Sequence, residues 1–180
     1  MNSGLKPIDK TKWKIMSTKE EINVVDFLKD FINNHNGCDI IVGTDSQEKG
    51  RSVTYVTAIV AVFPNNRGSR VVYTKESIGK IKESWMRLEK EAFRSLEVAE
   101  YLYKNDVSVT HIELDYQDGD NFSSKGLITK SRPLYSAYSG IFSAIGCHIN
   151  GKTYYEHKDT NTWKSYYTLS AIAAADKLSK

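Results

Sequence analysis

The segment from Ile40 to Gln47, which reads Ile-Ile-Val-Gly-Thr-Asp-Ser-Gln, constrains the fold of this chain more than any other. Its apolar, β-branched start is typical of a buried strand, and Asp45 lies at or inside the end of that strand. A buried charge is costly without a partner. A second run of the same kind, from Val109 to Asp115, also ends in an acid. Two strands that each carry a carboxylate near one end suggest a divalent-metal site, because clustered acids repel one another unless a cation lies between them.

The bulk composition indicates an ordered, soluble protein. The 180 residues suffice for one domain with a substantial core, and they include only three prolines. No apolar stretch approaches the length of a membrane span, and Met1–Lys14 lacks the apolar segment of a signal peptide. Cys38 and Cys147 are far apart and form no CxxC pattern, which favours reduced, packed cysteines. We therefore expect a cytoplasmic protein without a membrane segment.

Basic residues are unevenly distributed, although the net charge is only +3. Lysines are concentrated between Lys6 and Lys19, and lysines and arginines together between Arg67 and Arg94. Such clusters suit a polyanionic partner such as nucleic acid. On a mildly basic protein they are more often a solvated face.

Hydrophobic periodicity predicts an N-terminal helix followed by three strands. The run Ser17-Thr18-Lys19-Glu20 fits a capping box, and apolar residues at helical spacing follow it as far as Asn34. The strand that carries Asp45 comes next, and short turns between successive strands favour an antiparallel meander. The remaining ranges are a turn at Gln47–Arg51, strands at Val53–Phe63 and Arg70–Ile78, and a hairpin turn at Pro64–Gly68.

Helices and strands are expected to alternate from there to the C-terminus. One apolar stripe predicts a long helix that Asn105 closes, and its members are Trp85, Leu88, Ala92, Leu96, Ala99 and Tyr103. The later elements are a strand ending at Asp115, a loop at Asp118–Gly126, a helix at Leu134–Ile145, a strand at Cys147–Tyr155 with a turn at Asn150-Gly151, and a helix at Thr168–Leu178.

This order predicts an α/β fold with a mixed sheet and helices on both faces. Three antiparallel strands come first, alternating helices and strands follow, and a further helix precedes them all. The strand that carries Asp45 should lie centrally, beside the strand that ends at Asp115. We divide the chain into an N-terminal extension and helix, residues 1–36, packed on a domain of residues 37–180.

Four motifs carry a resemblance to a known superfamily: Gly43-Thr44-Asp45-Ser46-Gln47, Glu91 through Ala99, His111 through Asp115, and Ala174-Ala175-Asp176-Lys177-Leu178. Together with the order of the elements they resemble the ribonuclease H-like superfamily, from about Cys38 to the C-terminus. That superfamily takes acids from its first strand, its first core helix, the end of its fourth strand and its last helix. The chain is most similar to the YkuK-type family of bacterial and phage proteins within that superfamily, whose N-terminal helix it shares.

The resemblance implies a nuclease whose catalytic and metal-binding acids are Asp45, Glu91, Asp115 and Asp176. Two Mg²⁺ or Mn²⁺ ions about 3.5–4 Å apart would promote hydrolysis of a phosphodiester. By the same resemblance Asp45 bridges both ions, Glu91 and Asp115 hold one, and Asp176 holds the other. The substrate remains open between RNA, an RNA–DNA hybrid, structured DNA and single strands.

The residues alone leave alternatives to these assignments. Asp45 and Asp115 also suit turns, and Asp176 suits a solvated helix face. On a helical wheel of about 100° per residue, Glu89 lies nearer the centre of the apolar stripe than Glu91, so either is a candidate ligand. The runner-up acids are Glu89 and Asp159, and the candidate contacts to nucleic acid are Ser46, Gln47, Lys125, Lys130 and Arg132.

A second function also fits the sequence. The chain could keep the fold without catalysis, as a nucleic-acid-binding module or as an accessory subunit of a replication or repair assembly. In that case the acids would bind a metal weakly or only structurally.

Overall fold

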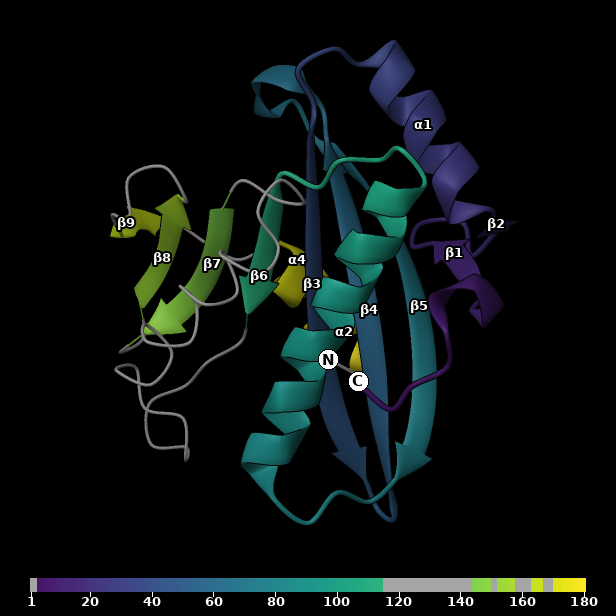
Figure 1. Ribbon diagram of the computed structural model, residues 1–180, viewed down its shortest axis with the longest axis vertical. Coiled ribbons are helices and arrows are strands. Elements are labelled where there is room, and N and C mark those ends of the chain that lie inside the picture. The colour runs from purple at the N-terminus through teal and green to yellow at the C-terminus, as the bar shows by residue number, and fades with distance from the viewer. Residues whose placement is uncertain (1–2, 115–143, 150–151, 158–162, 167–169) are drawn as a thin grey trace.

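Nine strands form one sheet in the computed structural model, which describes residues 3–114, 144–149, 152–157, 163–166 and 170–180 (Figure 1). The order across the sheet is β2-β1-β5-β4-β3-β6-β7-β8-β9. The strands are β1 (Trp13–Ile15), β2 (Glu21–Ile22), β3 (Asp39–Lys49), β4 (Ser52–Val62), β5 (Ser69–Gly79), β6 (His111–Leu114), β7 (Ala144–Ile149), β8 (Lys152–His157) and β9 (Trp163–Tyr166). The helices are α1 (Val24–Asn34), α2 (Ser84–Lys104) and α4 (Ser170–Ser179), with short 3₁₀ turns η1 (Ile8–Lys10) and η2 (Pro64–Asn66).

The centre of the sheet has the predicted mixed topology. Strands β3, β4 and β5 form an antiparallel meander whose register runs without interruption along each pair. Strand β6 lies parallel to β3 on its other side, and β7 lies parallel to β6. The predicted α/β fold is therefore confirmed, with the Asp45 strand in a central position.

Helices cover both faces of this sheet (Figure 1). Side chains of β3 alternate between the two faces, as a strand requires. Ile40 and Val42 pack in the main core together with residues of α1 and α2, whereas Ile41 packs with Ala171 of α4. The sequence of β3 is apolar on both sides because neither side faces water, which is the pattern of a central strand.

Two segments at the N-terminus differ from the prediction. The Ser17–Glu20 run lies in the turn between β1 and β2, where Lys19 adopts a positive φ of 62°. The helix begins only at Val24, because the side chain of Asn23 accepts a hydrogen bond from the Asp26 backbone N–H at 3.0 Å and caps it. Its predicted end at Asn34 is correct.

The residues before β1 lie along α2. Lys90 Nζ donates to the Ser3 carbonyl at 2.7 Å, and an Arg94 guanidinium nitrogen donates to the Lys6 carbonyl at 2.7 Å. Burial lowers the pKa of Arg94, and the neighbouring carboxylates of Glu97 and Glu76 oppose that shift. These contacts and the pairing of β1 with β5 join the N-terminal segment to the sheet, while the proposed division of the chain at residue 36 stays a prediction.

Three further expectations were wrong in detail. Strand β3 continues through Lys49, so most of the turn predicted at Gln47–Arg51 is strand. Ala144 and Ile145, predicted to end a helix, lie in β7, and the rest of that predicted helix lies outside the described residues. Tyr103, placed on the apolar stripe, is 49% exposed. The predicted loop at Asp118–Gly126 lies outside the described residues, and no helix within the described ranges is long and apolar enough to span a bilayer.

Candidate functional site

The candidate site lies just beyond the last described pair between β3 and β6. The last described pair between these parallel strands joins Gly43 to Glu113, and β6 ends one residue later at Leu114. Strand β3 continues to Lys49, held from there on by its antiparallel partner β4. We call this place the β3–β6 notch. Among the described residues, no strand pairs with this side of β3 beyond Gly43.

Asp45 lies in β3 just past the notch and is 7% exposed. Its backbone is paired with Val56 of β4 in the uninterrupted register. Thr44 and Ser46 contact α2, so by alternation Asp45 lies on the opposite face, which α4 covers. A carboxylate is thus built into the middle of a rigid hairpin.

Glu91 approaches from α2 on the other face. Glu91 is only 3% exposed. One of its carboxylate oxygens accepts a hydrogen bond from the Ser46 hydroxyl at 2.5 Å. One turn further along α2, the Ser95 hydroxyl lies 2.8 Å from that of Thr44. These contacts fix α2 against β3. Ser46 therefore holds the Glu91 carboxylate in one orientation, while its candidacy as a contact to nucleic acid stays a prediction.

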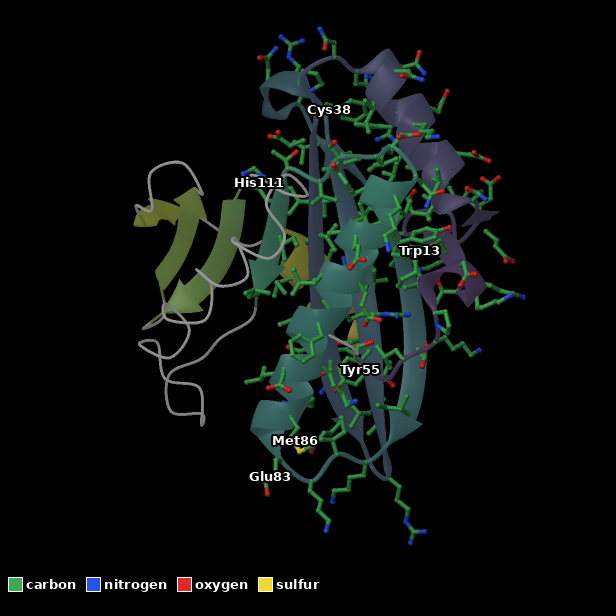
Figure 2. The ribbon with its side chains drawn as sticks, viewed as in Figure 1. Trp13, Cys38, Tyr55, Glu83, Met86 and His111 are labelled. Carbon is green, nitrogen blue, oxygen red and sulfur yellow. The ribbon has the colours of Figure 1, made fainter. Side chains whose placement is uncertain are left out.

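Tyr55 of β4 lies close to this carboxylate. Its hydroxyl donates to the Arg87 carbonyl at 3.3 Å, and the ring is buried beneath α2. Burial raises the pKa of Tyr55 well above its usual range, and the negative charge of Glu91 raises it further. Figure 2 shows Tyr55 and Cys38 toward opposite ends of the long strands, so the candidate site and Cys38 are well separated.

The Tyr55 environment predicts a loss of stability at alkaline pH that Tyr55→Phe should remove. A tyrosine in the unfolded chain ionises near pH 10, whereas the folded pKa is raised, so the unfolded state loses its proton first. The resulting stabilisation is complete below about pH 10 and is lost as the pH rises toward the folded pKa. Between pH 9 and 11, urea titrations should show the wild type losing about 1 kcal/mol more than Tyr55→Phe. Equal losses would contradict this assignment.

The other predicted site residues either lie at more exposed positions than Asp45 and Glu91 or fall outside the described residues. Asp176 lies on α4, its side chain 47% exposed and paired with Lys180 at 3.2 Å. Glu89 is only partly buried, so the glutamate that faces inward is Glu91, and which of the two is a ligand stays a prediction. Gln47, the residue after Ser46 in β3, is partly buried. The remaining candidates lie outside the described residues: Asp115, Lys125, Lys130, Arg132 and Asp159.

The described residues contain no group of three or more His, Cys, Asp or Glu side chains arranged to hold a metal ion. Asp45 and Glu91 come from opposite faces of the sheet, and Asp115 follows directly after the last described residue of β6. The four-acid constellation therefore stays a prediction. Its donor chemistry fits Mg²⁺ or Mn²⁺, because carboxylate and hydroxyl oxygens are the hard ligands these ions prefer.

One acid that the sequence analysis did not single out is Glu113 in β6. It is 1% exposed, and its Oε2 accepts hydrogen bonds from the backbone N–H groups of Ala171 and Ile172, both at 3.0 Å. Glu113 thus caps the first turn of α4 from a different element. The signal for it was present: an acid two residues before Asp115, inside a run otherwise typical of a buried strand.

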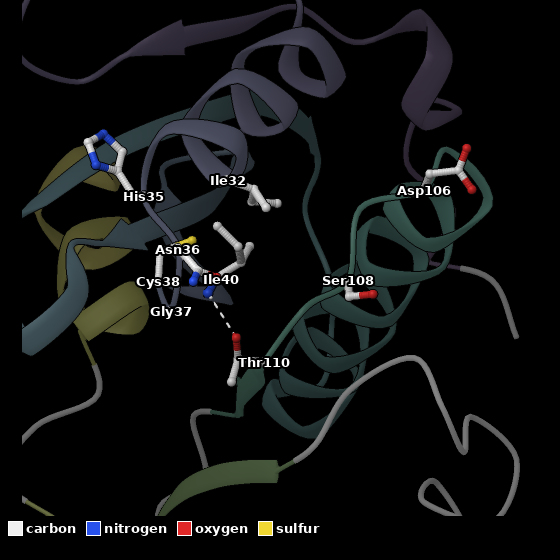
Figure 3. Close-up of a pocket in the computed structure, with 9 residues that line it drawn as sticks. All are labelled: Ile32, His35, Asn36, Gly37, Cys38, Ile40, Asp106, Ser108 and Thr110. Atoms are coloured by element: carbon white, nitrogen blue, oxygen red, sulfur yellow. Dashed lines mark hydrogen bonds between the residues drawn. The ribbon is translucent and has the colours of Figure 1, made fainter.

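A cavity of about 310 Å³ lies at the opposite end of β3 (Figure 3). Thr110 is one of the residues that line the cavity, and its hydroxyl accepts a hydrogen bond from the Ile40 backbone N–H at 3.0 Å. The His35 ring packs against Phe31 and Phe63, with centroids 4.5 and 4.7 Å away. His35 and Asp106 lie at opposite sides of the cavity in Figure 3, so its titratable groups do not converge on one point.

A family model described as "Ribonuclease H-like" matches residues 23–131, which is more than half of the chain. The matched range contains α1, the β3–β4–β5 meander, α2 and β6, and hence Asp45, Glu91 and Asp115. Neither the curated proteins nor the solved structures contain a match to the chain.

Proposed function

Because the chain belongs to the ribonuclease H-like family, we propose that it is a divalent-metal-dependent nuclease that hydrolyses phosphodiester bonds in nucleic acid. The observation that carries this proposal is the pair of buried carboxylates at the β3–β6 notch. Asp45 comes from a central strand, and Glu91 comes from the helix packed on it through Ser46. Buried acids on two rigid elements that lie next to each other are costly for stability, and a cation site is a reason to retain them.

The residues that would hold Mg²⁺ or Mn²⁺ are Asp45, Glu91, Asp115 and Asp176. When bound, such ions supply positive charge that stabilises the developing charge of phosphodiester hydrolysis. The parallel register supports the choice of the two strand acids, since two residues beyond the Gly43–Glu113 pair the sequence reads Asp45 and Asp115. Ser46 keeps the Glu91 carboxylate in one orientation, as partners of metal ligands commonly do.

Nucleic acid is the partner that the family and the basic clusters favour. Gln47 follows Ser46 at the notch and is a candidate for contact with a phosphate or sugar. Lys125, Lys130 and Arg132 are further candidates by charge alone.

A metal titration followed by a cleavage screen tests the proposal. Wild-type protein should bind Mn²⁺ in calorimetry, and with Mg²⁺ or Mn²⁺ it should cleave at least one labelled substrate among hybrid, duplex RNA, duplex DNA, branched DNA and single strands. EDTA should abolish the cleavage. Mn²⁺ binding without cleavage of any substrate would refute the nuclease, and absence of Mn²⁺ binding would refute the metal site itself.

One observation favours the second candidate, a non-catalytic nucleic-acid-binding module. Asp176 forms an ion pair with Lys180 on the surface of α4 instead of joining Asp45 and Glu91 in the described structure. A binding module would retain labelled nucleic acid in a gel-shift assay with EDTA present and would show no cleavage when Mn²⁺ is added.

A further inference from the structure

Glu113 makes a contact that joins strand β6 to helix α4. It lies in β6 beside β3, and its Oε2 accepts the N–H groups of both Ala171 and Ile172 at 3.0 Å. The first N–H groups of a helix have no partner within the helix, and they carry its positive dipole end. A buried carboxylate on these groups satisfies both requirements at once, because the charge gains donors and the helix gains a cap.

Gly43 permits the close approach that this contact needs. It pairs with Glu113 across β3 and β6. A β-carbon at position 43 would lie 2.9 Å from the Ala171 Cβ and 2.9 Å from the Ile172 backbone nitrogen, which is closer than such atoms tolerate. The start of α4 therefore rests directly on the β3 backbone, with Glu113 holding it there.

This contact between the first turn of α4 and Gly43 lies at the β3–β6 notch. Gly43 is two residues before Asp45 on the same face of β3. From its first turn, α4 crosses toward β4 and β5, and Ala175 packs in one cluster with Val56 and Tyr73. Asp176 is the next residue along that helix. The position of Asp176 relative to the strand acids is consequently set by where the first turn of α4 is fixed.

We infer that Glu113 is a positioning residue for the proposed metal site: it fixes α4, and with it Asp176, against the strand that carries Asp45. The inference rests on the proposed function, because it assigns Glu113 a role toward the same metal site. Glu113 acts through the helix and is not itself assigned as a ligand.

Amide hydrogen exchange and Mn²⁺ calorimetry on matched variants test this inference. In the metal-free protein, Glu113→Ala should speed exchange of the α4 amides by about tenfold or more relative to the wild type. Its Kd for Mn²⁺ should rise by about tenfold or more, because the first turn of α4, and with it Asp176, is no longer held in place. Glu113→Gln retains an acceptor oxygen and should show smaller changes in both measurements. Gly43→Ala should reproduce the effect of Glu113→Ala with Glu113 intact, and it replaces that variant if Glu113→Ala does not fold.

Ile112→Val is the control for general destabilisation of β6. Ile112 is adjacent to Glu113 but packs in the main core on the opposite face. It should lower overall stability while leaving α4 exchange and the Mn²⁺ affinity within about twofold of wild type. If Glu113→Ala and Gly43→Ala bind Mn²⁺ as tightly as Ile112→Val, the inference is wrong while the metal site stands. If the wild type itself binds no Mn²⁺, the proposed function fails and the inference fails with it.

Discussion

Asp45→Asn is expected to reduce metal-dependent cleavage by about 10³-fold or more while the protein stays folded. The two side chains have nearly the same shape, so the packing around β3 should not change. An amide carries no charge, and a metal ligand contributes several kcal/mol of charge stabilisation, each 1.4 kcal/mol being a factor of about ten in rate. Asp45 is only 7% exposed, so no side-chain motion or bulk water can readily replace its charge. Initial cleavage rates at saturating Mn²⁺, with circular dichroism as the check on folding, measure the effect.

Glu89→Gln is the matched control for that experiment. Glu89 lies on α2 two residues before Glu91 but is only partly buried. Its substitution removes the same charge from the same region and should change the rate by no more than about twofold, as expected for a surface substitution. An Asp45→Asn protein that cleaves as fast as the wild type would remove Asp45 from the site.

Leu28→Ala should lower the free energy of unfolding by about 2–5 kcal/mol. Leu28 lies on α1, is fully buried, and packs in the main core that includes residues of β3, β4 and α2. Its truncation leaves a cavity that neighbouring side chains fill only in part. Equilibrium unfolding in urea, followed by tryptophan fluorescence and circular dichroism together, measures the loss.

Lys29→Ala provides the comparison, because Lys29 is the next residue and is exposed. It should change stability by less than about 0.5 kcal/mol. The two probes should give coincident transitions in Leu28→Ala if α1 unfolds with the sheet. A Leu28→Ala protein of wild-type stability would show instead that residues 1–36 form a separable extension.

Much of the fold was readable because its elements carry strong local periodicity. The β3–β4–β5 meander has long β-branched runs between clear turns, and the end of α2 at Asn105 was predicted correctly. The start of α1 was wrong because Ser, Thr, Lys and Glu suit a turn as well as a capping box. The pairing of β1 with β2 and with β5 decides between the two.

The site was less predictable for a related reason. The inward face of α2 includes Glu91 because the helix contacts the sheet and the N-terminal segment together, which widens its buried side beyond one apolar stripe. The role of Glu113 depends on α4, whose first turn is 57 residues or more away in sequence. Neither contact leaves a periodic signal, so the sequence could nominate the acids but could not orient them.

The pairing of β1 with β5 also bears on self-association. Strand β5 runs from Ser69 to Gly79, and β1 meets it at Lys14–Tyr73 and Ile15–Val72. A version of the chain that begins at Val24 would lack β1 and β2. The backbone groups of β5 that pair with β1 would then have no strand partner. Bare strand edges recruit further strands from other molecules. The short N-terminal hairpin covers part of this edge, at Val72 and Tyr73, and we expect such a truncated chain to form concentration-dependent oligomers.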